Sequence, residues 1–169
     1  MKNTIITTGF LLFITFWVMS AQITEGLIND FNDGTNQNWK RGMNVNNMLK
    51  LTADGSGEGG KLVTFNTNQW TGNYIEAGIK NITLKAMNPN NENLFLRLVF
   101  STSENPKTGT VFCTKDAVEI MPADKAAHIV FSIKKEDMVK LSGNGNYEDL
   151  MSSVKHFRII HNSNPNYQG

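Results

Sequence analysis

The stretch that decides the fold is residues 93–101, NLFLRLVFS. In a β-strand, successive side chains point to opposite faces, so Leu94, Leu96 and Leu98 share one face and Arg97 points from the other. Both faces are otherwise apolar, which is typical of a central strand that is covered on both sides. The pattern therefore predicts a layered sheet with Arg97 emerging from its second face.

A second stretch, residues 154–161 (VKHFRIIH), repeats this arrangement. Phe157, Ile159 and His161 alternate with His156 and Arg158. Each of two predicted central strands thus carries one arginine, and the two arginines could share a polar, concave face.

Turn signals separate several further short runs of alternating or β-branched residues, which favours an all-β antiparallel β-sandwich. The additional predicted strands are residues 26–31, 48–52, 61–66, 79–87, 110–114, 117–120 and 127–133.

The connections between these strands carry recognisable signals as well. The segment NPNNEN, residues 88–93, is rich in proline and asparagine and predicts a hairpin-type turn. One or two short helices are also expected, within residues 133–141 and after Asn146, whose side chain suits a helix N-cap.

The N-terminus has the composition of a secretory signal peptide. Lys2 precedes an uncharged, mostly apolar run that ends in the small residues Ser20 and Ala21. We therefore expect residues 1–21 to be removed, leaving residues 22–169 as one secreted domain of a size that supports a full hydrophobic core.

The charge balance and the cysteine count exclude some classes of partner and some kinds of cross-link. The chain has 16 Lys and Arg against 15 Asp and Glu, and this balance argues against nucleic acid or an anionic membrane as partner. Cys113 is the single cysteine, so no internal disulfide forms. We interpret Cys113 as a small buried apolar residue rather than a nucleophile.

Two local motifs invite ligand-binding interpretations. The run GSGEGG, residues 55–60, formally fits a dinucleotide-binding motif, but KLVTF follows it with a strand pattern in place of a helix, which favours a hairpin loop. Asp30 and Asp33 lie in DFNDG, which does not match an EF-hand. Either a structural Ca²⁺ site of another type or an Asx-type turn would account for these two carboxylates.

The sequence shows no catalytic constellation. His128, His156 and His161 have no metal-ligand spacing, and no serine lies in a nucleophile-elbow motif. Glu76 and Glu119 are the carboxylates nearest to aromatic or strand positions, and solvent exposure is the favoured interpretation for both. We therefore expect a protein that is not an enzyme.

Three segments together carry a family resemblance: DFNDGTNQNW (30–39), residues 66–101 beginning NTNQWTGNY, and VKHFRIIHN (154–162). They resemble secreted bacterial domains with the galactose-binding-like jelly roll that many carbohydrate-binding modules share, distantly similar to laminin-B modules. The positions that match are Trp70, Gly72, Tyr74, Ala77, Gly78, Arg97, Arg158, His161 and Asn162.

This chain departs from the family pattern at two positions, and its length differs too. Asn32 and Asn73 stand where the family has acidic residues, which weakens any calcium site near Asn32. The family also tends to continue past residue 169 into a final strand, so the resemblance implies a domain that lacks this strand: either the sequence is a fragment, or one edge of its sheet is left unpaired.

The resemblance implies carbohydrate binding through Trp70, Tyr74, Arg97, Arg158 and His161. Two interpretations of Trp70 stay open: a sugar-stacking platform, or a plug at the end of the sandwich. The arginines would favour acidic glycans because a guanidinium pairs with carboxylate or sulfate. Their alternative role is an internal ion pair or stacking on an aromatic ring.

The expected function is a non-catalytic, extracellular carbohydrate-binding module that binds a polysaccharide or glycan, alone or beside other domains of a larger protein. A structural or adhesion domain that binds a protein through its sheet edge is the alternative. A small jelly-roll polysaccharide lyase is a third hypothesis, although the lyase signatures Gln-(Ile/Val)-His and Tyr-Phe-Lys-Ala-Gly are absent from the sequence.

Overall fold

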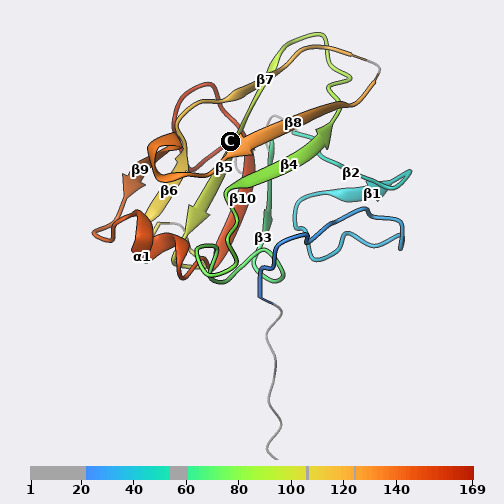
Figure 1. The fold of residues 1–169 in the computed structure, drawn as a ribbon. Coiled ribbons are helices and arrows are strands. Elements are labelled where there is room, and N and C mark those ends of the chain that lie inside the picture. Colours follow the sequence, from blue (N-terminus) through green and yellow to red (C-terminus); the bar gives the residue numbers. More distant parts are fainter. Residues whose placement is uncertain (1–21, 54–60, 106, 124) are drawn as a thin grey trace, which may run out of the picture.

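The computed structural model describes residues 22–53, 61–105, 107–123 and 125–169 (Figure 1). The predicted signal peptide, residues 1–21, and the glycine-rich run at 55–60 lie outside these described residues.

The centre of the fold is an antiparallel six-stranded sheet (Figure 1). Five of its strands follow the order β3-β10-β5-β6-β9. The sixth strand, β7, pairs with the first residues of β5, from Leu94 to Leu96. The bounds are β3 Val63–Asn66, β5 Leu94–Ser101, β6 Val111–Thr114, β7 Val118–Ile120, β9 Met138–Ser142 and β10 His156–His161.

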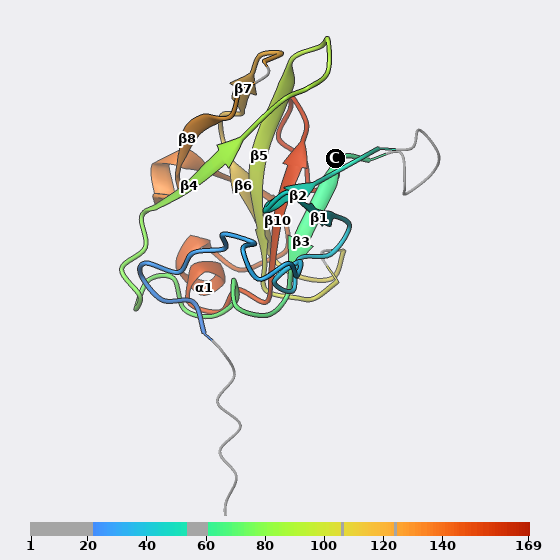
Figure 2. The ribbon, with the colours of Figure 1, turned by 90° about the vertical axis from the view of Figure 1, so that its right-hand side faces the viewer.

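A second layer covers one face of this sheet. It consists of β4 (Asn81–Ala86) and β8 (Ala127–Ser132), which pair antiparallel and lie to one side of the six-stranded sheet in Figure 2. A separate hairpin of β1 (Met43–Val45) and β2 (Met48–Lys50) lies near β3. The predicted all-β antiparallel sandwich is therefore confirmed.

The main core lies between the two layers. Leu98 and Phe100 of β5 are fully buried there against Ile82 and Phe131 of the second layer. Val99, one residue away, belongs to a different apolar cluster on the opposite face of the sheet. The alternation predicted for residues 93–101 is confirmed, and β5 is covered on both faces.

One short helix, α1 (Tyr147–Met151), begins where the sequence predicts. The Asn146 side chain accepts a hydrogen bond from the Asp149 backbone N–H, and the Asp149 side chain accepts one from the Asn146 N–H. This capping box satisfies two N–H groups at the helix start that have no partner within the helix. Leu150 and Met151 then contribute to the main core.

The predicted strand at residues 26–31 is wrong. Gly26 and Phe31 have φ angles of +80° and +57°, and the Leu27 N–H donates to the Thr24 carbonyl. Left-handed backbone at both ends of a six-residue segment prevents a ladder from forming. The strand predicted for 48–52 is shorter in the structure, and its hairpin partner β1 was not predicted.

The expected helix within residues 133–141 is mostly wrong. A single 3-10 turn spans Lys135–Asp137, and β9 follows at once. Met138 and Val139 pack on opposite faces of the sheet, as a strand requires. Pairing with β6 therefore outweighs the local helical preference of this segment.

The segment 88–93 turns as predicted, but it is not a hairpin. β4 pairs with β8 and β5 with β10, β6 and β7, so this turn carries the chain from one layer to the other. Asn88 is fully buried and its amide donates to the carbonyls of Glu92 and Ile120. The asparagine thus fixes the crossing between the layers.

Candidate functional site

The second face of the six-stranded sheet carries a small apolar cluster of Val63, Val99, Val111, Cys113 and Ile160. The segment 162–169 lies against this face, with Tyr167 packed on the cluster. Its start is fixed by the Asn162 N–H, which donates to the Phe95 carbonyl at 2.8 Å.

Arg97 points to this second face, as predicted, but it is buried there with 3% of its surface exposed. Its guanidinium donates four hydrogen bonds, to the backbone carbonyls of Thr114, Lys115, Asn162 and Ser163 at 2.6–2.9 Å. These contacts give no support to the predicted ligand-binding role of Arg97, because they join segment 162–169 to the end of β6.

Arg158 lies on the same face, on the neighbouring strand β10, and is partly exposed. Its Nε donates to His156 Nε2 at 3.0 Å and one Nη donates to the Tyr167 carbonyl at 2.9 Å. The guanidinium carbon lies 5.9 Å from the ring centroid of Phe65, within range of a cation–π interaction.

His156, which accepts this hydrogen bond from Arg158, is buried. Because its Nε2 accepts from Arg158, its Nδ1 must carry the proton and donate to the Glu104 carbonyl. Burial, together with the Arg158 charge, lowers the pKa of His156. This histidine is therefore neutral at pH 7.

These residues line an open hollow of about 500 Å³ on the second face, here called the sheet groove. Its volume falls within the range of about 300–1,000 Å³ that is usual for small-molecule sites. Apart from Val63 and Gly169, its lining combines cationic, aromatic and neutral polar side chains with one acidic side chain: Arg41, Lys61, Phe65, Thr67, Glu104, Asn105, Lys107, His156, Arg158, Tyr167 and Gln168.

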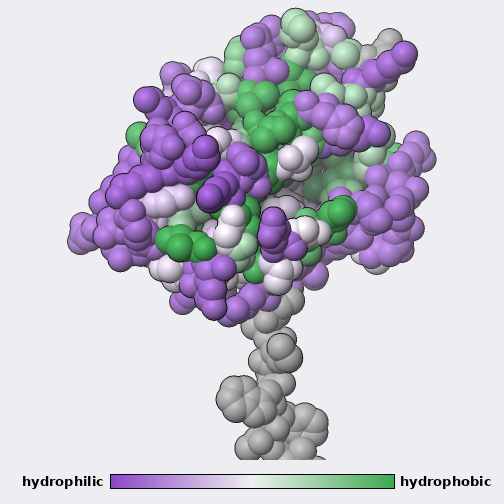
Figure 3. Space-filling model, viewed as in Figure 1, coloured by the Kyte–Doolittle hydropathy of each residue, from purple (hydrophilic) through white to green (hydrophobic). Residues whose placement is uncertain are grey.

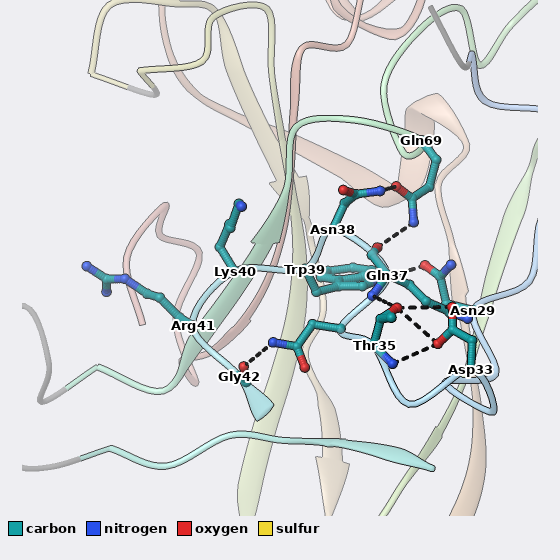
Figure 4. A pocket seen from close by; sticks show the side chains of 11 residues that line it. Asn29, Asp33, Thr35, Gln37, Asn38, Trp39, Lys40, Arg41, Gly42 and Gln69 are labelled. Atoms are coloured by element: carbon teal, nitrogen blue, oxygen red, sulfur yellow. Dashed lines mark hydrogen bonds between the residues drawn. The ribbon is translucent and has the colours of Figure 1, made fainter. Parts of the chain in front are cut away.

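A second hollow, of about 690 Å³, is formed by the loop that precedes β1, and is here called the loop hollow (Figure 4). Side-chain amides line it, and they bind mainly one another and the backbone. Gln69 donates to the Gln37 carbonyl and accepts from Asn38, while Asn36 donates to the Gly42 carbonyl. Figure 4 shows that Arg41 extends away from these amides, and it also lines the sheet groove.

The amides of the loop hollow are thus mainly structural. Trp39 forms its floor with 5% of its surface exposed, so the indole face is not open to a sugar. The Trp39 Nε1–H donates to Asn29 Oδ1, which also accepts from Trp70. We therefore place the candidate ligand site in the sheet groove rather than in the loop hollow.

The question that the sequence leaves open about Trp70 is clarified by its contacts. Its ring stacks on Phe157 with centroids 5.3 Å apart and lies 6.0 Å from Trp39. Its Nε1–H is bound to Asn29. This is the arrangement of a plug at the end of the sandwich.

Tyr74 and His161 are also held by internal contacts. Tyr74 is 1% exposed, and its hydroxyl donates to the Trp70 carbonyl. This burial gives no support to its predicted role as a ligand residue. His161 Nδ1 accepts from the Phe95 N–H, and its ring stacks on the Phe95 ring. Of the five predicted carbohydrate-binding residues, Arg158 alone lines the sheet groove.

Asp30 and Asp33 have the contacts of Asx-type turns. Asp30 accepts from the Asn32 N–H, and Asp33 accepts from both the N–H and the hydroxyl of Thr35. These hydrogen bonds lower the pKa of both carboxyl groups. Within the described residues, no three His, Cys, Asp or Glu side chains form a group that could hold a metal ion. A calcium site of backbone carbonyls with these two carboxylates stays a prediction.

Cys113 is fully buried on the second face, as predicted. Burial raises the pKa of its thiol to about 11, although the nearby Arg97 charge opposes the shift. The thiol is therefore protonated at neutral pH, which leaves little of the reactive thiolate.

Sequence reasoning missed most of the groove. Phe65 lies beside Arg158 because β3 pairs with β10 in a register that sets the two residues opposite each other. Lys61 and Lys107 come from segments far apart in the chain. No spacing in the sequence predicts these contacts, since strand pairing and the course of the connecting loops bring the residues together.

Comparisons of the chain with protein-family models, with curated proteins and with solved structures gave no match. The galactose-binding-like resemblance therefore stays a prediction from the sequence motifs. In the part of the chain that the structure describes, no helix has the length and apolar character needed to cross a bilayer.

Proposed function

We propose that this protein is a secreted, non-catalytic carbohydrate-binding module and that its glycan binds in the sheet groove. The observation that carries the proposal is the grouping of Arg158, Phe65 and polar side chains around one open hollow on a rigid sheet. Carbohydrate sites orient sugars with a few hydrogen-bonding groups held in place, and the Arg158 guanidinium, which lies against the Phe65 ring, is such a group.

The fixed position of the Arg158 side chain in the groove supports a binding role. Arg158 is held by His156, by the Tyr167 carbonyl and by the Phe65 ring before any ligand arrives. A side chain that is already fixed loses little conformational entropy when a ligand binds, so its contacts contribute more to affinity. Thr67 and Asn105, both exposed at the rim, offer hydroxyl and amide partners for sugar hydroxyls.

Affinity electrophoresis of the purified protein through gels that contain different polysaccharides tests the proposal. We expect at least one polysaccharide to retard the protein. Arg158→Gln should reduce that retardation by about tenfold in affinity because it removes a charged hydrogen-bonding fork. Lys85→Gln, which changes an exposed cation on β4 in the other layer, serves as the matched control.

Near-ultraviolet circular dichroism should show that Arg158→Gln keeps the native packing. Retardation that is absent for every polysaccharide would overturn the proposal. Retardation that Arg158→Gln leaves unchanged would move the site away from the sheet groove.

A protein-binding role is a second candidate because several large apolar side chains are exposed. Figure 3 shows apolar surface on the face of the molecule that carries β4 and β8. Exposed apolar residues on or beside strands in the described part of the chain include Met43, Val45, Met48, Met87, Met121 and Val130. Sedimentation velocity tests the simplest form of this role, self-association, which Val130→Lys should abolish.

A further inference from the structure

We propose that the sheet groove selects an anionic glycan, one that bears uronate carboxylates or sulfate esters. This inference rests on the proposed carbohydrate-binding function and adds the chemical class of the ligand. Its basis is the concentration of positive charge in the groove.

Among the described residues, four cationic side chains line the groove, Arg41, Lys61, Lys107 and Arg158, and Glu104 supplies the one acidic side chain. The whole chain is nearly balanced, with 16 Lys and Arg against 15 Asp and Glu. His156 adds no charge at neutral pH, because its Nε2 accepts the Arg158 hydrogen bond. The excess of cations is therefore a local property of this hollow, of the kind that concentrates anionic ligands.

The cations reach the groove from separate parts of the fold. Arg158 lies on β10, Lys61 just before β3, Lys107 on the loop between β5 and β6, and Arg41 just before β1. Lys61 is held at one side, where its Nζ donates to Gln168 Oε1 at 2.8 Å. A carboxylate or sulfate in the groove would add charge-assisted hydrogen bonds to these groups, which are stronger than bonds between neutral partners.

The aromatic geometry favours a glycan over a single-stranded nucleic acid. Proteins bind single strands by stacking bases on open aromatic faces. Here the Phe65 ring already contacts His156, with centroids 4.9 Å apart, and the Arg158 guanidinium. The neutral groups Thr67 and Asn105 at the rim suit hydroxyl-rich ligands, and nucleic acid becomes an outcome of the test.

The test compares four ligands by affinity electrophoresis at 50 mM and 500 mM NaCl: polygalacturonate, chondroitin sulfate, neutral galactomannan and single-stranded DNA. We expect one of the two anionic glycans to bind at least tenfold more strongly than galactomannan at the lower salt. This preference should shrink at the higher salt, because ions screen exposed charges.

Charge reversal gives the decisive comparison. Lys107→Glu should weaken binding of the anionic glycan about fivefold, and adding Lys61→Glu should weaken it further. Lys85→Glu makes the same change in net charge on β4, in the other layer, and should leave the affinity unchanged.

The outcomes separate the two proposals. Binding of galactomannan as strong as that of the anionic glycans would keep the carbohydrate-binding function and overturn the charge selection. Binding of single-stranded DNA as strong as that of polygalacturonate, or equal effects of Lys107→Glu and Lys85→Glu, would also overturn it. Retention of none of the four ligands would overturn this inference, while binding to another neutral polysaccharide would still leave the module assignment standing.

Discussion

Arg97 and Arg158 lie on the same face of neighbouring strands, and both donate hydrogen bonds to backbone carbonyls of segment 162–169. Arg97 binds the carbonyls of Asn162 and Ser163, and Arg158 binds that of Tyr167. Yet Arg97 is buried beneath the segment whereas Arg158 remains partly exposed beside it. Arg97 therefore serves the fold, and Arg158, which lines the sheet groove, is the arginine to which we assign ligand binding.

The buried position of Arg97 makes it a stability determinant. Arg97→Lys keeps the positive charge but loses the planar fork that reaches four carbonyls, leaving several of them without a donor. We expect the free energy of unfolding to fall by about 3 kcal/mol, measured by urea denaturation.

Arg41→Lys is the matched control, because Arg41 is exposed and should change stability by less than about 0.5 kcal/mol. Equal effects of the two substitutions would show that the Arg97 hydrogen bonds contribute no net stability.

Trp70 offers a direct comparison between a plug and a sugar platform. Trp70→Ala removes a ring that stacks on Phe157 and contacts Trp39, so we expect a loss of about 3 kcal/mol in the free energy of unfolding. Trp70→Phe keeps the stacking and loses the hydrogen bond to Asn29, which should cost about 1 kcal/mol.

Glycan retention should be unchanged by Trp70→Phe, because Trp70 does not line the sheet groove. Weaker retention at unchanged stability would instead identify Trp70 as a sugar-stacking platform.

Local patterns determined the parts of the fold that sequence reasoning placed correctly. β5 and β10 place apolar side chains on both of their faces, interrupted on the second face by Arg97, His156 and Arg158, so the alternation in the sequence agrees with the burial of both strands. Asn146 begins α1 because its side chain and that of Asp149 satisfy each other's backbone N–H groups. Each of these features depends on residues that are neighbours in the chain.

Features that depend on distant partners were not accessible in the same way. β9 forms because it pairs with the edge of β6. Residues 138–142 alone give no sign of this partner. Arg97 and Arg158 looked equivalent in the sequence, and the difference between them arises from how segment 162–169 crosses the sheet. Phe65 became part of the candidate site only through the register of β3 against β10.

Calcium binding at Asp30 and Asp33 remains a prediction that a titration decides. Their carboxylates already accept hydrogen bonds from Asn32 and Thr35. If the loop is held by these turns alone, calcium in the millimolar range should raise the melting temperature no more than magnesium does. A rise that saturates with calcium and disappears in Asp33→Asn would show a metal site. Thr83→Ala, at an exposed position on β4, controls for a loss of stability that does not involve the metal site.

His156 predicts that stability falls in mildly acidic solution. Its pKa in the folded protein is lowered from the ordinary value of about 6.5, chiefly by burial and further by Arg158. Below about pH 6.5 the unfolded chain therefore binds a proton that the folded protein does not, and the free energy of unfolding decreases as the pH falls. His156 exchanges at most one proton, so its own contribution to the slope should not exceed about 1.4 kcal/mol per pH unit.

Urea denaturation between pH 5.5 and 8 measures this dependence. His156→Gln should be less stable at pH 8, where the Arg158 Nε has lost its imidazole acceptor, and should show a flatter dependence on pH. Thr83→Ala, at an exposed position on β4 that does not titrate, should keep the slope of the parent protein. Since protonated His156 cannot accept from Arg158, acid should also loosen the arginine in the sheet groove. A slope that His156→Gln leaves intact would assign the pH dependence to other groups.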